Sequence, residues 1–235
     1  PNPIGARDTP FNLRAPASTV PTISSLSVSD DNPTVVSIVG LFVQGLSVLK
    51  ATVNAAGAYG SSITDRRFSV DGSSTPSGGS LPVRSAGSVP VSATANDSRG
   101  RVGEWAGTIN VLPYFNPLFT SVLVRRATAA GVVSDEGTSL RVDLNAAVSS
   151  LMNGTQRNSM TIRVFTSPRG GSVWTARNVI NHSGVTYNSN FVVSGGANYP
   201  VDDSFDVRVD VVDKFNTSSA QTVIATAAVF MHWSK

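Results

Sequence analysis

Few residues in this chain have the chemistry of a catalytic group. Cysteine is absent, and the only two histidines are His182, in the segment Asn181 to Gly184, and His232, beside Trp233. A serine hydrolase pairs its histidine with a strained serine, yet the G-x-S-x-G pattern of a nucleophile elbow does not occur. We therefore interpret the histidines as loop and strand-end residues, and we expect no catalytic residues and no enzymatic activity.

Carboxylates occur in three adjacent pairs, which are Asp30-Asp31, Asp135-Glu136 and Asp202-Asp203. Paired carboxylates can act in a glycosidase, and they can also bind calcium. A calcium site would need Asp30, Asp31 and Asp97 to converge, and the D-x-D/N-x-D/N-G calcium loop is absent. Because aspartate is common in turns, where its side chain bonds nearby backbone groups, we favour turn residues. We expect no metal site and no cofactor.

Aromatic side chains raise the question of sugar binding, because an exposed ring can stack on the face of a sugar. The chain has three tryptophans and four tyrosines. Packing in a core or an interface is the commoner role of a tryptophan in a β-sandwich. Trp174 and Tyr187 border the glycine-rich part of the second half, so these two are our candidates for contact with a glycan.

The basic residues do not indicate a nucleic-acid partner, although the net charge is +3 and the pI is about 9.6. Lysine and arginine are scattered, apart from Arg66-Arg67 and Arg125-Arg126, and neighbours on a strand point to opposite faces. The most apolar run, residues 35–53, is interrupted by glycine and polar residues and is rich in β-branched residues, which favours strands. We expect no binding to nucleic acid and no membrane insertion.

Alternation of apolar and polar residues predicts β-strands through most of the chain. Turn clusters such as Asp97 to Gly100 and Asp71-Gly72 separate them, and residues 30–33, 55–60 and 73–80 are expected to be turns or loops. The expected strands are residues 23–29, 41–53, 63–70, 89–95, 108–112, 118–127, 140–144, 158–166, 172–178, 190–193, 205–211 and 222–231.

A proline-rich connector divides this series of strands. Pro113, Tyr114, Phe115 and Pro117 cannot continue a central strand, so we predict a short, stiff interdomain linker. Residues 91–100 and 207–216 share the same order, a strand followed by a turn that begins with aspartate, which indicates an internal repeat. We predict an all-β protein with two tandem immunoglobulin-like β-sandwiches, residues 20–113 and 114–235, after a proline-rich lead-in over residues 1–19.

Several short motifs together resemble the siphophage tail proteins of the DUF859 family. They are Gln44 to Ser47, Ala55 to Gly60, Asp97 to Arg101, Val111 to Pro117, Asp135 to Thr138 and His232 to Lys235. The resemblance covers most of residues 10–235 and concerns turns and linkers. It implies tandem domains in a minor structural protein of the tail tip or tail fibre, located in the virion, with other tail proteins as partners. It supplies no catalytic residues.

The function we expect is therefore structural: a non-enzymatic segment that spaces or presents the receptor-binding part of a phage tail. A chain that begins Pro1-Asn2-Pro3 is expected to be a piece or a processed form of a longer protein. One alternative is a carbohydrate-binding adhesin module that contacts the host cell-wall glycan, and another is a capsid decoration protein. A homotrimer is expected by analogy with fibres. A polysaccharide-degrading enzyme is the weakest alternative, because no site for it is visible.

Overall fold

The computed structural model describes residues 19–193 and 198–227 of the chain. Most of the expected lead-in, together with His232, lies outside the described residues. The described residues form two compact units: the first comprises those up to Asp31 together with Ser47–Asn110, and the second comprises Asn32–Leu46 together with those from Val111 onward. Residues 32–46 therefore interrupt the first unit in sequence, and the single division expected after residue 113 stays a prediction.

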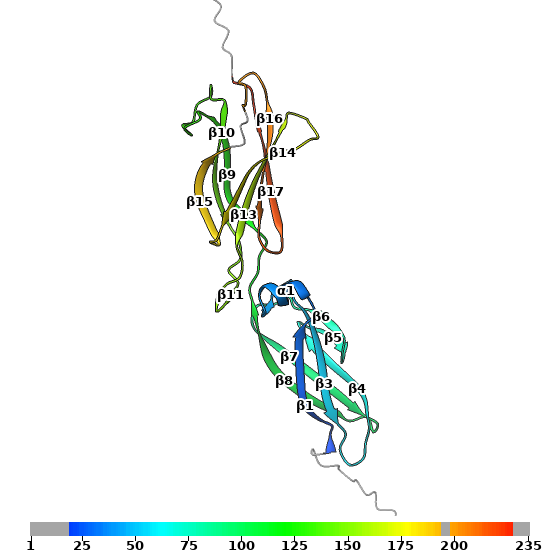
Figure 1. Cartoon of the computed structure of the whole chain (residues 1–235). Coiled ribbons are helices and arrows are strands. Elements are labelled where there is room, and N and C mark those ends of the chain that lie inside the picture. The colour runs from blue at the N-terminus through cyan, green and yellow to red at the C-terminus, as the bar shows by residue number, and fades with distance from the viewer. Residues whose placement is uncertain (1–18, 194–197, 228–235) are drawn as a thin grey trace, which may run out of the picture. The chain divides into compact units, whose positions relative to one another are not determined.

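Two antiparallel sheets build the first unit (Figure 1). One has the order β1-β3-β6, and the other contains the order β8-β7-β4-β5. Every second residue is buried along most of β3 and β7, and Leu49, Val53, Phe68 and Val91 fill the space between the sheets. The strands are β1 (Thr22–Asp30), β3 (Val48–Ala56), β4 (Ile63–Val70), β5 (Ser73–Pro76), β6 (Ser80–Pro82), β7 (Gly87–Asp97) and β8 (Val102–Leu112).

The second unit has the same plan with a larger core. Its sheets have the orders β15-β10-β9 and β14-β13-β16-β17, and a two-stranded hairpin, β11-β12, is added. Leu140, Leu144, Ile162, Val164 and Val209 are among the buried residues between the sheets. The strands are β9 (Leu118–Ala127), β10 (Ser139–Ala147), β11 (Met152–Asn153), β12 (Thr155–Gln156), β13 (Met160–Pro168), β14 (Thr175–His182), β15 (Thr186–Val192), β16 (Phe205–Val212) and β17 (Thr217–Ile224).

The two units correspond strand by strand. The sheet β1-β3-β6 matches β9-β10-β15, and the order β5-β4-β7-β8 matches β14-β13-β16-β17. In each unit the first two strands share a three-stranded sheet, and the last two strands are neighbours in the other sheet. The predicted fold class, all-β with tandem immunoglobulin-like sandwiches, is confirmed by this arrangement.

One element was predicted wrongly as strand. Residues Pro33–Ile38 form a short helix, α1, and strand pairing resumes only at β2 (Phe42–Val43), which runs parallel to Val111 and Leu112 of β8. The side chain of Asn32 caps the helix, because its Oδ1 accepts hydrogen bonds from the amides of Thr34 at 3.0 Å and Val35 at 3.4 Å. Pro33 then occupies the first turn, where its missing N–H costs nothing.

Other differences come from short or shifted strands. The predicted loop over residues 73–80 contains β5 and the first residue of β6, which pair with longer neighbours. The long strand predicted over residues 41–53 is broken at Gly45, whose φ of 70° turns the chain before β3. The hairpin at Asp71-Gly72 is confirmed, with φ values of 49° and 73° that suit a tight turn. Residues 228–231 of the last predicted strand lie outside the described residues.

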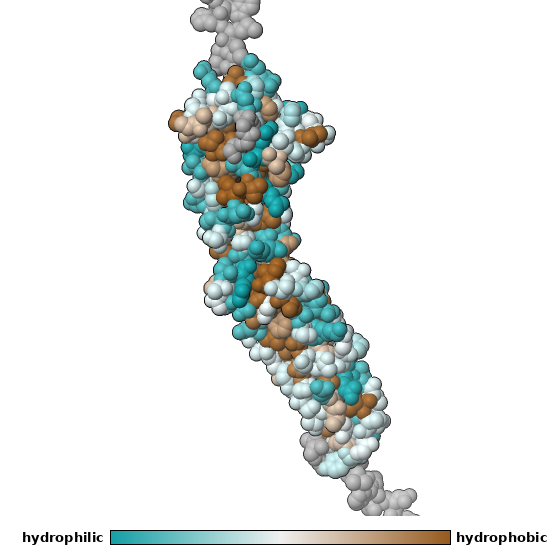
Figure 2. Space-filling model, in the orientation of Figure 1, coloured by the Kyte–Doolittle hydropathy of each residue, from teal (hydrophilic) through white to brown (hydrophobic). Residues whose placement is uncertain are grey.

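The surface of the described residues is mixed in polarity. Figure 2 shows apolar residues interspersed with hydrophilic ones over the visible face. Within the described ranges, no helix has the length and apolar character needed to cross a membrane.

Candidate functional site

One of the predicted linker residues, Tyr114, belongs to an apolar cluster within the second unit. We call it the connector cluster: buried Val35, Val39, Val43 and Leu151, with partly buried Ile38, Leu46, Leu112, Tyr114 and Phe215 packed against them. Five of these residues come from the segment 35–46, which contains α1 and β2. The others are Leu112 at the end of β8, Tyr114 of the linker, Leu151 after β10 and Phe215 in the turn after β16. The amide of Asn153 also donates to the carbonyl oxygen of Val39 at 2.7 Å, which holds the β11-β12 hairpin against the end of the helix.

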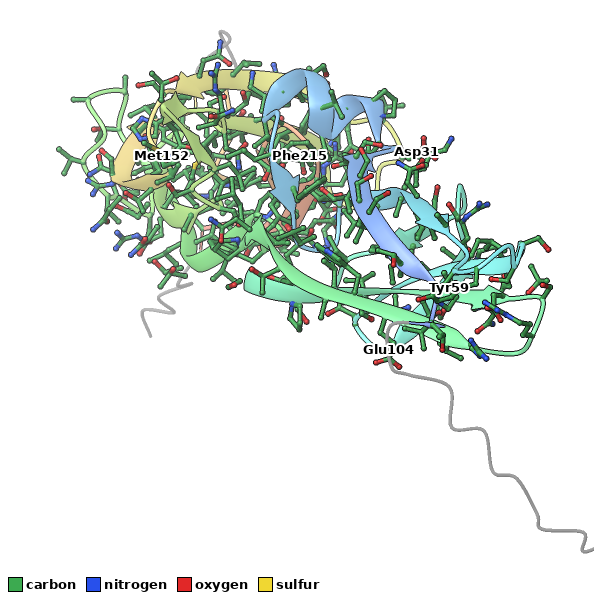
Figure 3. All side chains as sticks on the ribbon, turned by 90° about the horizontal axis from the view of Figure 1, so that it is seen from below. Asp31, Tyr59, Glu104, Met152 and Phe215 are labelled. Carbon is green, nitrogen blue, oxygen red and sulfur yellow. The ribbon has the colours of Figure 1, made fainter. Side chains whose placement is uncertain are left out.

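The two aromatic rings of the linker have different surroundings. The Tyr114 ring meets Phe215, which Figure 3 labels, edge to face with ring centroids 5.8 Å apart. Phe115 is 48% exposed, and its backbone N–H and carbonyl oxygen both bond the hydroxyl of buried Ser149, at 2.6 and 3.0 Å. Of the two prolines, Pro117 is buried and Pro113 is exposed. Specific contacts thus hold the two aromatic residues of the linker.

A buried polar network surrounds the Tyr114 hydroxyl. It accepts a hydrogen bond from the amide of Asn216 at 2.9 Å and lies 3.4 Å from the Asp213 carboxylate. Asp213 also accepts from the backbone N–H groups of Phe215 and Asn216 and from the amide of buried Asn158. Burial raises the pKa of Tyr114, and although the Asn216 bond opposes this, the negative charge of Asp213 adds to it, so that the pKa reaches about 12.

We expect Tyr114 to ionise at a pH well above the ordinary pKa of a phenol. Because the folded pKa of Tyr114 lies above its ordinary 10.0, the neutral phenol stabilises the second unit up to about that pH, and the contribution is lost as pH rises toward 12. Ultraviolet absorbance during alkaline titration should show a late tyrosinate step that disappears in Tyr114→Phe. If Tyr114→Phe removes no absorbance step near pH 12, the described network is wrong.

The turn after β7 uses its aspartate in the same way as the turn after β16. Asp97 is 2% exposed, and its Oδ1 accepts hydrogen bonds from the backbone N–H groups of Arg99 and Arg101, both at 2.9 Å. The Arg99 guanidinium lies 3.1 Å from Oδ2. Burial would raise the pKa of Asp97, but the hydrogen bonds from Arg101, Ser61 and Arg99 outweigh it and lower the pKa to about 2.

The first unit should therefore lose stability in acid through Asp97. Since the folded pKa lies below the ordinary 3.8, the ionised carboxylate stabilises the fold above that pH, and the stabilisation is lost as pH falls toward 2. Asp97→Asn should be less stable than the wild type at neutral pH, and the gap in thermal midpoint should narrow in acid. Asp65→Asn, at a side chain that is 39% exposed, is the control. A gap that stays constant with pH would contradict this role.

The other candidate groups of the sequence are dispersed. Asp30 is paired with Leu49 at one end of β3, whereas the Asp97 turn bonds Ala58, beyond its other end, so these carboxylates do not converge. Among the described residues, no group of three or more histidine, aspartate or glutamate side chains could hold a metal ion. His182 ends β14 instead of lying in a loop, and its Nε2 is 2.8 Å from the Thr186 carbonyl oxygen.

The two glycan candidates, Trp174 and Tyr187, are not brought into contact. Trp174 immediately precedes β14, where its ring lies 5.2 Å from the Arg208 guanidinium. Tyr187 belongs to β15 of the other sheet, packs against the core, and meets the His182 ring edge to face at 5.4 Å. The two rings thus stand near opposite ends of β14. Trp105 has a packing role, because its ring covers Gly107 so closely that a Cβ there would lie 2.4 Å from it.

Sequence reasoning missed a buried arginine at the end of β9. Arg126 is 7% exposed, and its guanidinium donates to five carbonyl oxygens, those of Gly137, Tyr199, Pro200, Asp203 and Ala225. Its neighbour Arg125 is partly exposed and pairs with Asp143 at 2.8 Å. Arg126 shares the inward parity of Val122 and Val124, and this alternation was the signal that could have identified it.

Comparison with solved structures found sandwich proteins of low sequence identity. The three N-terminal domains of the highly immunogenic outer capsid protein (Hoc) of bacteriophage RB49 match with a TM-score of 0.40 and 11% identity, over 83% of this chain and 65% of that one. A segment of titin gives 0.37 and 11%, over 86% and 66%. Two fibronectin type III domains of chicken tenascin give 0.26 and 10%, over 87% and 99%. The chain thus spans slightly less than two thirds of the first two structures.

Comparison by sequence gave one family. The sequence model of DUF859, described as a siphovirus protein of unknown function, matches residues 1–235. A search of curated proteins found no match.

Proposed function

Because the chain belongs to DUF859, a family of siphovirus proteins of unknown function, we propose that it is a structural segment of the virion. In this proposal it lies in the tail tip or a tail fibre, has no enzymatic activity, and spaces or presents the part of the tail that binds the host receptor. Its partners are other tail proteins.

The observation that supports a spacing role is the path of the chain. Residues 32–46 leave the first unit after β1 and return to it at β3, yet Val35, Val39 and Val43 lie in the connector cluster of the second unit. The chain therefore passes between the units three times, after residues 31, 46 and 110. The two units thus share three covalent connections where a single linker would give one, and such connections suit a spacer.

The use of the buried acids supports the non-enzymatic part of the proposal. Asp97 and Asp213 are 2% and 8% exposed, and each is engaged by two backbone N–H groups of its own turn. Carboxylates committed in this way hold turns, and they are poorly placed to exchange protons with a substrate.

Immunogold electron microscopy tests the location. Antibody raised against this chain should place gold at the tail tip or along a tail fibre of intact siphovirus particles. Gold on the head would instead support a capsid decoration protein. If intact particles stay unlabelled while disrupted particles react, the proposal of an exposed tail segment fails.

Oligomeric state is a separate part of the proposal. A homotrimer is expected from the way that fibres assemble, and sedimentation equilibrium of the purified chain should then give three times its mass of 24.5 kDa. A single-chain mass at all concentrations would contradict self-assembly by these residues alone.

A further inference from the structure

The outer face of the sheet β14-β13-β16-β17, turned away from the core, carries polar and aromatic side chains in register. Residues directly opposite one another on neighbouring strands lie on the same face. Phe165 is thus opposite Arg208, and Arg208 is opposite Gln221. In the next row of the same face, Arg163 is opposite Asp210, and Asp210 is opposite Ser219. In the row after that, Thr161 is opposite Asn181.

An arginine stacked on aromatic rings marks one end of this face. The Arg208 guanidinium lies 4.4 Å from the centre of the Phe165 ring and 5.2 Å from that of Trp174. Its Nε is 3.0 Å from Oδ1 of Asp210, whose residue is 8% exposed. Two rings and a buried carboxylate hold this arginine in place, and the Trp174 ring remains partly exposed beside it.

A shallow hollow of about 350 Å³ marks the other end. Hydroxyl, amide, imidazole and ammonium groups surround it, contributed by Ser159, Thr161, Asn181, His182, Ser183 and Lys214. Tyr187 packs edge-on against His182, so this candidate ring stands behind one wall of the hollow. Thr161 and Asn181 bond each other at 3.2 Å and connect the hollow to the rows described above.

The face carries two carboxylates, those of Asp206 and Asp210, which pair with Arg169 and Arg208, and it also carries two cations that have no such partner in the described part of the chain. Arg163 and Lys214 are exposed, and no carboxylate of the described residues lies within ion-pair distance of either. The carboxylate residue directly opposite Arg163 is Asp210, and it already pairs with Arg208. An incoming acidic ligand would therefore find two cations without competing partners.

We propose that this outer face binds an acidic glycan, one whose sugars carry phosphate groups. The Trp174 ring stacks on a sugar, Arg163 and Lys214 meet the acidic groups, and the hydroxyl and amide groups of the hollow bond sugar hydroxyls. β14 has eight residues and spans about 26 Å, which gives room for several sugars in a row. The site goes beyond the spacing role, which needs no ligand.

The proposal is tested by measuring how much of the purified chain is retained by cell walls of the bacterium that the virus infects. Purified walls should retain the full chain, and walls stripped of phosphate-linked polymers with hydrofluoric acid should retain little. Retention should fall as sodium chloride is added, because exposed cations contribute to binding. If intact walls do not retain the chain, or if stripped walls retain it equally, the proposal is overturned. Equal affinity for a DNA oligonucleotide would overturn the assignment to a glycan.

Two variants locate the binding. Trp174→Ala should weaken retention about tenfold, as loss of an aromatic anchor does. Arg163→Ala should weaken it about threefold and, because this side chain is exposed and unpaired among the described residues, should leave folding intact. The matched controls are Tyr59→Ala, at the tyrosine labelled in Figure 3 that is 78% exposed, and Arg66→Ala, at an exposed arginine of β4. If both test variants bind like the wild type, this face is not the site.

The experiment separates this proposal from the proposed function. Retention uses the purified chain, so it can succeed wherever the chain lies in the virion. Gold at the tail tip without wall binding would leave the spacing role and remove the glycan site.

Discussion

Replacing Arg126 with alanine should lower the free energy of unfolding of the second unit by about 3 kcal/mol. The guanidinium donates to five carbonyl oxygens from three segments of the chain, around residues 137, 199–203 and 225. Hydrogen bonds to a charged group contribute more than neutral ones, and buried acceptors that lose their donor keep the cost of leaving water. The loss should appear in chemical or thermal unfolding followed by circular dichroism.

The geometry of the guanidinium matters as much as its charge. Lysine also carries a positive charge, but an ammonium group has three donors and lacks the planar fork that reaches several carbonyls at once. Arg126→Lys should therefore recover only part of the stability. Arg125→Ala is the matched control, because that side chain is 42% exposed and its ion pair with Asp143 is expected to contribute less than about 1 kcal/mol. Equal losses in Arg125→Ala and Arg126→Ala would refute the role of the five bonds.

Strands with long alternation could be predicted well from the sequence. Residues 63–70 and 118–127 form β4 and β9 with the expected bounds, because alternation records which face of a strand meets the core. β5 and β6 could not be predicted in this way. They are four and three residues long, mostly polar, and exist because longer strands offer partners for their backbone groups.

For helix α1, the strand propensity of its residues predicts the wrong secondary structure. Val35, Val36 and Ile38 are β-branched and were interpreted as strand, yet the Asn32 cap, proline in the first turn and burial of Val35 favour a helix of six residues. A helix of this length has too few turns to show a period of 3.6 in its apolar residues. The Asn-Pro pair at its start was the sequence signal that could have predicted it.

The candidate sites depend on contacts that are remote in sequence. The connector was predicted from its prolines and aromatic residues, but Tyr114 meets Asp213 and Asn216, which are 99 and 102 positions away. The predicted glycan residues Trp174 and Tyr187 were named for their type and for the glycine-rich part of the chain beside them. Pairing of β13 with β14 and β16 is what adds Arg163, Phe165 and Arg208 to the proposed face.

Leu151→Ala should cost the second unit about 3 kcal/mol of unfolding free energy. Leu151 is fully buried in the connector cluster with Val35, Val39 and Val43. These three residues come from a segment that lies between two strands of the first unit in sequence, so their packing against Leu151 helps to hold residues 32–46 in the second unit. Removing three buried carbon atoms leaves a cavity that the helix and the β11-β12 hairpin can only partly fill.

A second measurement separates loss of this cluster from general loss of stability. If truncation loosens the packing around Tyr114, water reaches its phenol, and the pKa should fall from about 12 toward the ordinary 10.0. Leu123→Ala, at a side chain of β9 that is 50% exposed, should change neither stability by more than about 0.5 kcal/mol nor the late tyrosinate step. A Leu151→Ala protein that keeps both its stability and the late step would show that the connector cluster does not hold the linker.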